Sequence, residues 1–228
     1  MTARNHIEEA LTKMSQGDIF IASMFYREKF HDVISEAAYY KVLERMVKAK
    51  KLGKVAKGVY YIPEVTRFGV VPASGKKITS SLIEDNSGME VGYSLYRKYG
   101  ISTQVSKFTH IYSNRIDSNS KTIGNVKVDK IELDFTNDTQ VLIAGLEVMQ
   151  HYYDIQDLNI SGFKALAKKF AKSFNQDTFD TILEKIKYKK STLAFACSIL
   201  NYYKVSHGIS ERLSSLSKYH FPEIELLL

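Results

Sequence analysis

Cysteine is nearly absent from this sequence, and long apolar runs are missing. The single cysteine, Cys197, excludes an intrachain disulfide and favours a reducing compartment. No stretch reaches the roughly 18 apolar residues that a membrane-spanning helix needs. Charged side chains stand near the N-terminus, where a signal peptide would have an apolar core. We therefore expect a cytoplasmic protein that does not enter a membrane.

Patterns typical of catalytic and metal sites are also missing. The histidines are scattered without metal-ligand spacing, and Cys197 lies in an apolar run typical of a core helix. The segment from Gly69 to Lys77 resembles a phosphate-binding loop but has one residue too many between its glycines. We expect no catalytic residues, no metal and no cofactor.

An acidic group near the middle of the chain leaves one enzymatic alternative open. Glu132 and Asp134 would share one face of an expected strand, beside Asp129 and Asp138, as carboxylates of a two-metal site would. Because no accompanying histidine or Gly-Ser signature supports that chemistry, we interpret the group as a solvated strand edge and keep the enzyme as a third hypothesis.

The sequence does contain enough residues for two modest domains, and it carries an excess of positive charge. The 228 residues are 44% hydrophobic and 25% charged, values typical of a folded globular protein. The net charge of +7 favours polyanionic partners such as nucleic acid, but only the position of the charge can decide this. We found no internal repeat or low-complexity tract.

The first 65 residues predict three helices followed by a hairpin. Apolar residues at helical spacing indicate a first helix that stops at Gly17, and a second over Ser23 to Lys29 with Ser23 as its cap. A third helix, Ser35 to Lys50, has Ser35 as its cap and the clearest apolar periodicity. The segment 54–62 then predicts two strands joined by a turn at Lys57 and Gly58. This is the order of a winged helix-turn-helix.

The third helix would place its polar residues on the side opposite its apolar stripe. In a helix-turn-helix the N-terminal half of such a helix enters the major groove of DNA, where base edges are distinguishable. Between Lys41 and Lys57, seven basic residues stand against the one carboxylate of Glu44, so nearly all the net charge is concentrated there. The candidate DNA-binding residues are Ser35, Tyr40, Lys41, Glu44, Arg45, Lys48, Lys51, Lys54 and Lys57.

Within this set, we assign base and phosphate contacts by position. Ser35, Tyr40, Lys41 and Arg45 suit base or sugar edges, while lysines at the end of the helix and at the turn suit phosphates. Glu44 could accept a hydrogen bond from a cytosine amine or pair with Lys48. An ordinary amphipathic helix with a solvated lysine face is the alternative interpretation.

The remainder of the chain, residues 66–228, predicts a mixed α/β domain that ends in helices. We expect an irregular connection from Thr66 to Lys77, mostly helix from Ser80 to Gly100, and a strand at Thr109 to Ser113. Strands with a turn at Gly124 and Asn125 would fill residues 122–135, and helices would cover 139–153 and the region from Ser161 onward. The fold class is therefore α+β, with a domain boundary near residue 65.

Several segments resemble the AbiEi-type antitoxin and regulator family. These are residues 38–48, residues 58–63, residues 68–72, and residues 92–105, where a Thr-Gln-Val motif is followed by Ser106 in place of the family's proline. The resemblance covers roughly residues 5–135. It implies a winged-helix repressor of its own operon, with a C-terminal domain that counteracts a toxin of nucleotidyltransferase type.

Together these observations predict a sequence-specific DNA-binding regulator whose partner is duplex operator DNA, with an inverted repeat as one arrangement. The oligomeric state stays open. A protein-interaction module that uses the winged helix and the helical C-terminus is the alternative. A second basic group, Lys164, Lys168, Lys169 and Lys172, is either a solubilising face or a surface for DNA or an acidic partner.

Overall fold

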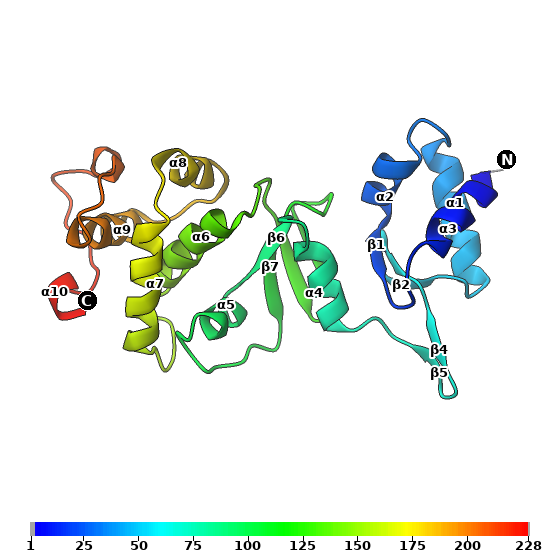
Figure 1. Ribbon diagram of the computed structural model, residues 1–228, viewed down its shortest axis with the longest axis horizontal. Coiled ribbons are helices and arrows are strands. Elements are labelled where there is room, and N and C mark those ends of the chain that lie inside the picture. Colours follow the sequence, from blue (N-terminus) through cyan, green and yellow to red (C-terminus); the bar gives the residue numbers. More distant parts are fainter. Residues whose placement is uncertain (1–2, 228) are drawn as a thin grey trace.

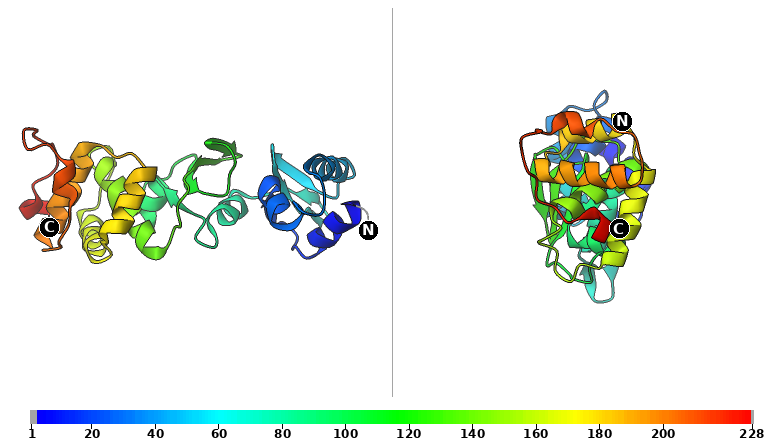
Figure 2. Two further views of the ribbon diagram at one scale, coloured as in Figure 1. Left: turned by 90° about the horizontal axis from the view of Figure 1, so that it is seen from above. Right: turned by 90° about the vertical axis from the view of Figure 1, so that its left-hand side faces the viewer.

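The computed structural model describes residues 3–227, and within them the chain forms a mixed α+β fold. Figure 2 shows an elongated molecule, with the N-terminal unit at one end and the C-terminal helices at the other. None of the helices within this range combines the length and apolar character needed to cross a bilayer. The predicted α+β class is confirmed at this level.

The N-terminal unit consists of three helices against a small antiparallel sheet (Figure 1). The helices are α1 (Ala3–Thr12), α2 (Ala22–Lys29) and α3 (Glu36–Lys48). The strands are β1 (Ile19–Ile21), β2 (Gly53–Ala56) and β3 (Val59–Tyr61), paired in the order β1-β3-β2. The predicted hairpin and its turn at Lys57 and Gly58 are confirmed, and Gly58 supplies the positive φ of 77° that the turn requires.

One apolar cluster holds this unit together. The stripe of α3 is buried through Tyr39, Val42, Leu43 and Met46, which pack with side chains of α1, α2 and β3. A fully buried side chain of this size stabilises the fold by about 1.5–3 kcal/mol. The periodicity of α3 therefore fixes which side of the helix faces outward.

Both predicted serine caps fail. Helix α2 begins one residue earlier than expected, and the Ser23 hydroxyl instead donates to the carboxylate of Asp117, far along the chain. Ser35 occupies the cap position of α3, but its side chain accepts no capping hydrogen bond. A tertiary partner thus takes the place of the local backbone partner at Ser23.

The expected irregular connection after residue 65 is instead a second hairpin. Strands β4 (Glu64–Thr66) and β5 (Gly69–Val71) pair antiparallel and extend away from the body of the molecule (Figure 1). The Thr66 hydroxyl accepts from the Phe68 amide and donates to the Gly69 carbonyl, and Gly69 adopts a φ of 110°. These local bonds explain a hairpin that hydrophobic periodicity does not indicate.

A larger sheet follows, covered on one side by α4 (Gly75–Ile83). Its strands are β6 (Gly88–Val91), β7 (Thr109–Ser113), β8 (Ser120–Ile123) and β9 (Val126–Lys130), with α5 (Tyr93–Lys98) between β6 and β7. The order is β6-β7-β9-β8, with β7 and β9 parallel and the other pairs antiparallel.

The predictions for this sheet are partly right. The strand from Thr109 to Ser113 and the turn at Gly124 and Asn125 are confirmed. The segment from Ser80 to Gly100, expected to be mostly helix, is divided by β6 between α4 and α5, and β9 ends at Lys130 rather than near residue 135. Strand β6 is short and buried, and such runs carry no alternation that separates them from a helix.

A second apolar cluster joins the sheet to the N-terminal unit. Ile78 and Leu82 of α4 pack with Ile111 of β7, and Ile21 and Val59 belong to the same cluster. Burial therefore continues across residue 65, the boundary that the sequence predicts between domains.

The C-terminal helices surround α6 (Asn137–Gln150), which is buried on almost every side. The others are α7 (Ile160–Lys172), α8 (Gln176–Lys185), α9 (Lys190–Tyr202), the 3-10 helix η1 (Ile209–Arg212) and α10 (Ile224–Leu227). Together with α5 and one face of the larger sheet they form the largest core. The predicted helical C-terminus is confirmed.

Candidate nucleic-acid interface

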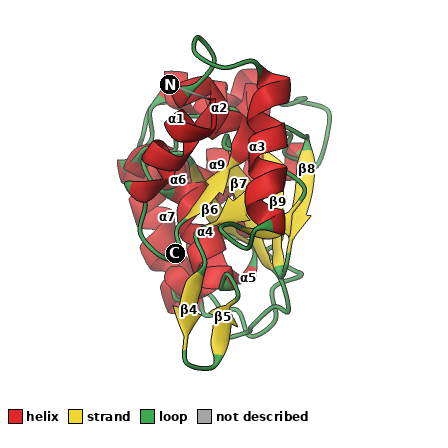
Figure 3. Cartoon of the chain, turned by 90° about the vertical axis from the view of Figure 1, so that its right-hand side faces the viewer, coloured by secondary structure: helices red, strands yellow, loops and turns green. Residues whose placement is uncertain are grey.

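The outward side of α3 carries the candidate residues that the sequence indicates. Of the nine, Tyr40 is partly buried and the other eight are exposed. Figure 3 views this end of the molecule and shows α3 in front of the strands of the larger sheet. The residues on α3 thus share one exposed side, and Lys54 and Lys57 on the β2–β3 hairpin are exposed as well.

Two of the candidate lysines are engaged in ion pairs. Lys48 lies 2.8 Å from the Glu44 carboxylate, and Lys51 lies 2.9 Å from the carboxylate of Glu8 on α1. The hydrogen bond from Lys48 lowers the pKa of Glu44, and the bonds from Lys51 and Arg4 lower that of Glu8. Glu44 is therefore an acceptor at neutral pH, while Lys51 braces α1 against the end of α3.

The remaining basic candidates keep their charge unpaired. Among residues 3–227, no carboxylate forms an ion pair with Lys41, Arg45, Lys54 or Lys57. Positive charge without a protein partner is what phosphate contacts require. Together with Lys48, whose partner Glu44 lies on the same helix, these four residues form what we call the basic face: Lys41, Arg45, Lys48, Lys54 and Lys57.

Arg45 and Tyr40 lie at opposite edges of the exposed side of α3. Arg45 lines a shallow cavity of about 240 Å³ between α1 and α3, together with Arg4 and Met46. Tyr40 packs edge-on against Tyr39, with ring centroids 5.3 Å apart. Burial, followed by the charge of Glu36, raises the pKa of Tyr40, so its hydroxyl stays protonated and able to donate.

The turn of the β2–β3 hairpin is held by tertiary contacts. The Gly58 carbonyl accepts from the Ala22 amide at 2.9 Å, and the Lys57 carbonyl accepts from the ammonium of Lys121 on β8 at 3.0 Å. The Lys57 side chain stays exposed. Lys121 therefore brings a further positive charge to the basic face, and sequence reasoning missed it because the two lysines are 64 positions apart.

Comparison with known proteins assigns the chain to a family. Residues 6–191 match the family described as "Family of unknown function (DUF6088)". The chain belongs to the DUF6088 family. The search of curated proteins found no match. The matched range contains the basic face, both hairpins and the larger sheet, so the candidate interface lies within the part that defines this DUF6088 member.

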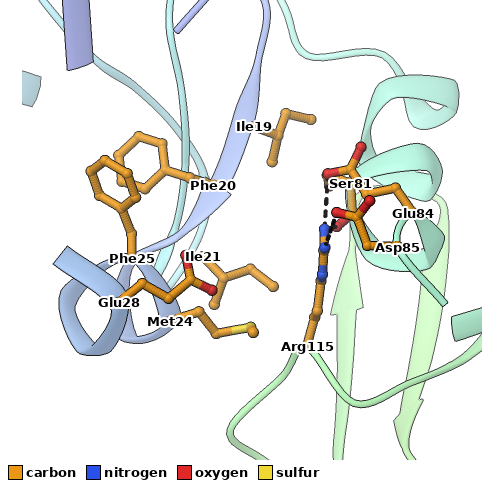
Figure 4. Close-up of a pocket in the computed structure, with 10 residues that line it drawn as sticks. All are labelled: Ile19, Phe20, Ile21, Met24, Phe25, Glu28, Ser81, Glu84, Asp85 and Arg115. Carbon is orange, nitrogen blue, oxygen red and sulfur yellow. Dashed lines mark hydrogen bonds and ion pairs between the residues drawn. The ribbon is translucent and has the colours of Figure 1, made fainter. Parts of the chain in front are cut away.

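A separate cavity in this DUF6088 chain lies between the N-terminal unit and α4 (Figure 4). It measures about 260 Å³, and its apolar wall includes Phe20, Met24 and Phe25. On the opposite wall, Arg115 donates to the Ser81 carbonyl at 2.7 Å and pairs with Glu84 and Asp85 at 2.8 and 2.9 Å. Because carboxylates outnumber the single arginine in its lining, this cavity does not suit a polyanion.

The acidic group of the enzymatic hypothesis is dispersed. Asp129 hydrogen bonds to His110 at 2.7 Å, and Glu132 pairs with Lys130 at 2.8 Å. Because β9 ends at Lys130, Glu132 and Asp134 do not share a strand face as expected. Across the described range, no cluster of three or more histidine, cysteine or acidic side chains is arranged to hold a metal ion.

Proposed function

We propose that this DUF6088 member is a winged-helix protein that binds duplex DNA in a sequence-specific way. The element order from α1 to β3 and the sheet order β1-β3-β2 support a winged helix-turn-helix in which α3 is the recognition helix. The observation that carries the proposal is the basic face, which is exposed and free of covering elements beside a buried apolar stripe.

In this proposal, the residues at the start of α3 and Arg45 contact base or sugar edges, and the lysines at the end of α3 and on the β2–β3 hairpin contact phosphates. Tyr40, Lys41 and Ser35 lie in or just before the N-terminal half that enters a major groove in helix-turn-helix proteins. Lys48, Lys54 and Lys57 supply phosphate contacts, and Arg45 reads a base or sugar edge. Lys51 acts indirectly, because its ion pair with Glu8 positions the end of α3.

We further propose that the regulated gene is the protein's own operon, as in the AbiEi-type family that the sequence resembles. The resembling segments lie in α3, in β3, around β5, and in α5 with the loop that follows it. On this hypothesis residues 66–228 counteract a nucleotidyltransferase-type toxin. Gln104 of the Thr-Gln-Val motif donates to Asp157 at 2.6 Å, a contact that gives this residue a structural role beside any functional one.

A protein-interaction module is the second candidate, and the β4–β5 hairpin favours it. Val65 is 69% and Phe68 86% exposed, on a hairpin that extends from the body. Exposed apolar side chains grouped in this way often contact a partner. Co-purification with the product of the neighbouring gene, resistant to nuclease treatment, would support this function over DNA binding.

A mobility-shift assay tests the leading proposal. The wild-type protein is titrated against its own upstream DNA and against random duplex of equal length, at moderate salt. We expect tighter binding to the upstream DNA, with an affinity that falls steeply as salt rises because phosphate contacts release counterions. Equal affinity for both duplexes would overturn the specific-regulator proposal.

A further inference from the structure

A cavity between α5, α6 and α7 has the composition of a small-anion site. It measures about 380 Å³, within the range of small-molecule pockets. Its lining residues are Lys98, Tyr99, Asn137, Gln140, Val141, Ala165, Leu166 and Lys169. This set contains two lysines, two amides, one aromatic ring and three apolar side chains, but no carboxylate. Of the second basic group identified in the sequence, only Lys169 belongs to the lining.

The two lysines come from different helices and converge on one ring. The ammonium of Lys98 lies 5.9 Å and that of Lys169 5.8 Å from the centroid of Tyr99. Lys98 also approaches the Gln140 side-chain oxygen at 3.5 Å. In the described part of the chain, neither ammonium forms an ion pair with a carboxylate. Both positive charges therefore border the same cavity without a carboxylate partner, and a bound anion would supply one.

Neighbouring elements strengthen the attraction for an anion. Helix α6 is 14 residues long and begins at Asn137, so the positive end of its dipole lies at the cavity. Asp138 offsets part of this field from the first turn, although it does not line the cavity. Lys164, Lys168 and Lys172 on α7 are exposed and add to the positive potential around the opening.

The rest of the lining suits a flat ring. Tyr99 is half-buried, and Val141, Ala165 and Leu166 provide apolar surface beside it. The Gln140 amide nitrogen donates to the Phe135 carbonyl at 2.9 Å, which turns its oxygen toward Lys98. A ligand with an anionic end and a planar apolar body would use both parts of this surface.

We propose that this cavity binds a nucleoside phosphate, with the phosphate held by Lys98 and Lys169 and the base against Tyr99 and the apolar residues. The site is separate from the basic face, since it lies among the C-terminal helices. Its existence does not depend on DNA binding by α3.

Calorimetric titration of the full chain tests the proposal with four nucleoside diphosphates, a nucleoside and inorganic phosphate as probes. We expect at least one diphosphate to bind more tightly than both inorganic phosphate and the nucleoside, because phosphate and base each contribute. If no diphosphate exceeds inorganic phosphate at millimolar concentration, the proposal is wrong. Binding of phosphate alone would mark a simple anion site and would also overturn it.

Substitutions locate the ligand. Lys169→Gln and Lys98→Gln should each weaken diphosphate binding about tenfold, as expected when a charge-assisted hydrogen bond is lost. Lys168→Gln is the matched control, because Lys168 is exposed on the same helix but outside the lining. It should change the affinity less than twofold. Equal weakening by Lys168→Gln and Lys169→Gln would show a diffuse field rather than this site. In mobility-shift assays, Lys169→Gln should bind DNA as the wild type does. The loss of diphosphate binding would then be independent of the DNA-binding proposal.

Discussion

The ammonium of Lys121 donates a 3.0 Å hydrogen bond to the backbone carbonyl of Lys57. Through this bond the larger sheet holds the turn of the β2–β3 hairpin in place. The tip of this hairpin therefore rests on the following sheet. The bond also places the charge of Lys121 at the turn that carries Lys57, so a residue of the larger sheet adds positive charge there.

Lys121→Met should therefore weaken binding to specific and random duplex alike. The substitution removes a positive charge and a support of the turn but touches no residue assigned to base edges. In mobility-shift titrations across a salt series, we expect the slope of log affinity against log salt to become shallower by about one. Lys127→Met is the control, because Lys127 lies on β9 over the Phe108 ring, 4.6 Å from its centroid. An unchanged slope for Lys121→Met would remove Lys121 from the interface.

Arg45 and Lys57 should differ in how they affect specificity. Arg45→Ala removes a side chain assigned to a base or sugar edge, so binding to the operator should weaken more than binding to random duplex. The difference between the two binding free energies should shrink by about 1–3 kcal/mol. Lys57→Ala removes a phosphate contact and should weaken both equally. Competition mobility shifts measure the two affinities, with Lys187→Ala among the exposed C-terminal residues as a neutral control. The reverse pattern would contradict the assignment of these two roles.

Tyr39→Phe should stabilise the protein. Tyr39 is fully buried, and its hydroxyl is the buried side-chain polar atom without a hydrogen-bond partner in residues 3–227. Burial strongly raises its pKa. Removing a hydroxyl that is desolvated without compensation should increase the free energy of unfolding by about 1 kcal/mol. Urea denaturation followed by circular dichroism measures the change. If the variant unfolds at a lower urea concentration, with the same dependence of the free energy of unfolding on urea, the hydroxyl has a stabilising partner.

Ionisation of Glu147 should lower the free energy of unfolding as the pH rises above the ordinary pKa of a carboxyl group. Its carboxyl is buried, which raises its pKa above 4.5, although hydrogen bonds from Tyr188 and Tyr112 at 3.0 and 3.1 Å oppose the shift. The folded state then binds the proton more tightly than the unfolded state. Stability is lost as pH rises from about 4.5 to the raised folded pKa.

Glu147→Gln tests this pH dependence. A glutamine oxygen can accept from both tyrosines but does not ionise. The free energy of unfolding of the variant minus that of the wild type should therefore be larger at pH 7 than at pH 4, as measured by urea titrations at both values. Glu132→Gln is the control, because Glu132 is exposed and Lys130 lowers its pKa. If the difference between the variant and wild-type free energies of unfolding becomes smaller as pH rises, the hydrogen bonds lower the pKa of Glu147 more than burial raises it.

Sequence reasoning succeeded where local pattern and burial agree. The apolar stripe of α3, the glycine turn between β2 and β3, and the strand at Thr109 to Ser113 were all predictable. It failed at β6, whose short buried run has no alternation, and at the β4–β5 hairpin, which depends on hydrogen bonds of Thr66 rather than on a core face. Ser23 was assigned a local cap but bonds to a distant carboxylate.

By itself, the sequence determined that the helix from Glu36 to Lys48 buries one side and exposes a basic one, because side-chain spacing along a helix fixes which residues share a face. Only the tertiary structure decided which distant charges join one another. Lys121 bonds to the backbone of Lys57, and Lys98 and Lys169 line one cavity beside Tyr99, across separations that no local period encodes. Packing of the sheet and the C-terminal helices brings these pairs together, and that packing is a property of the whole chain.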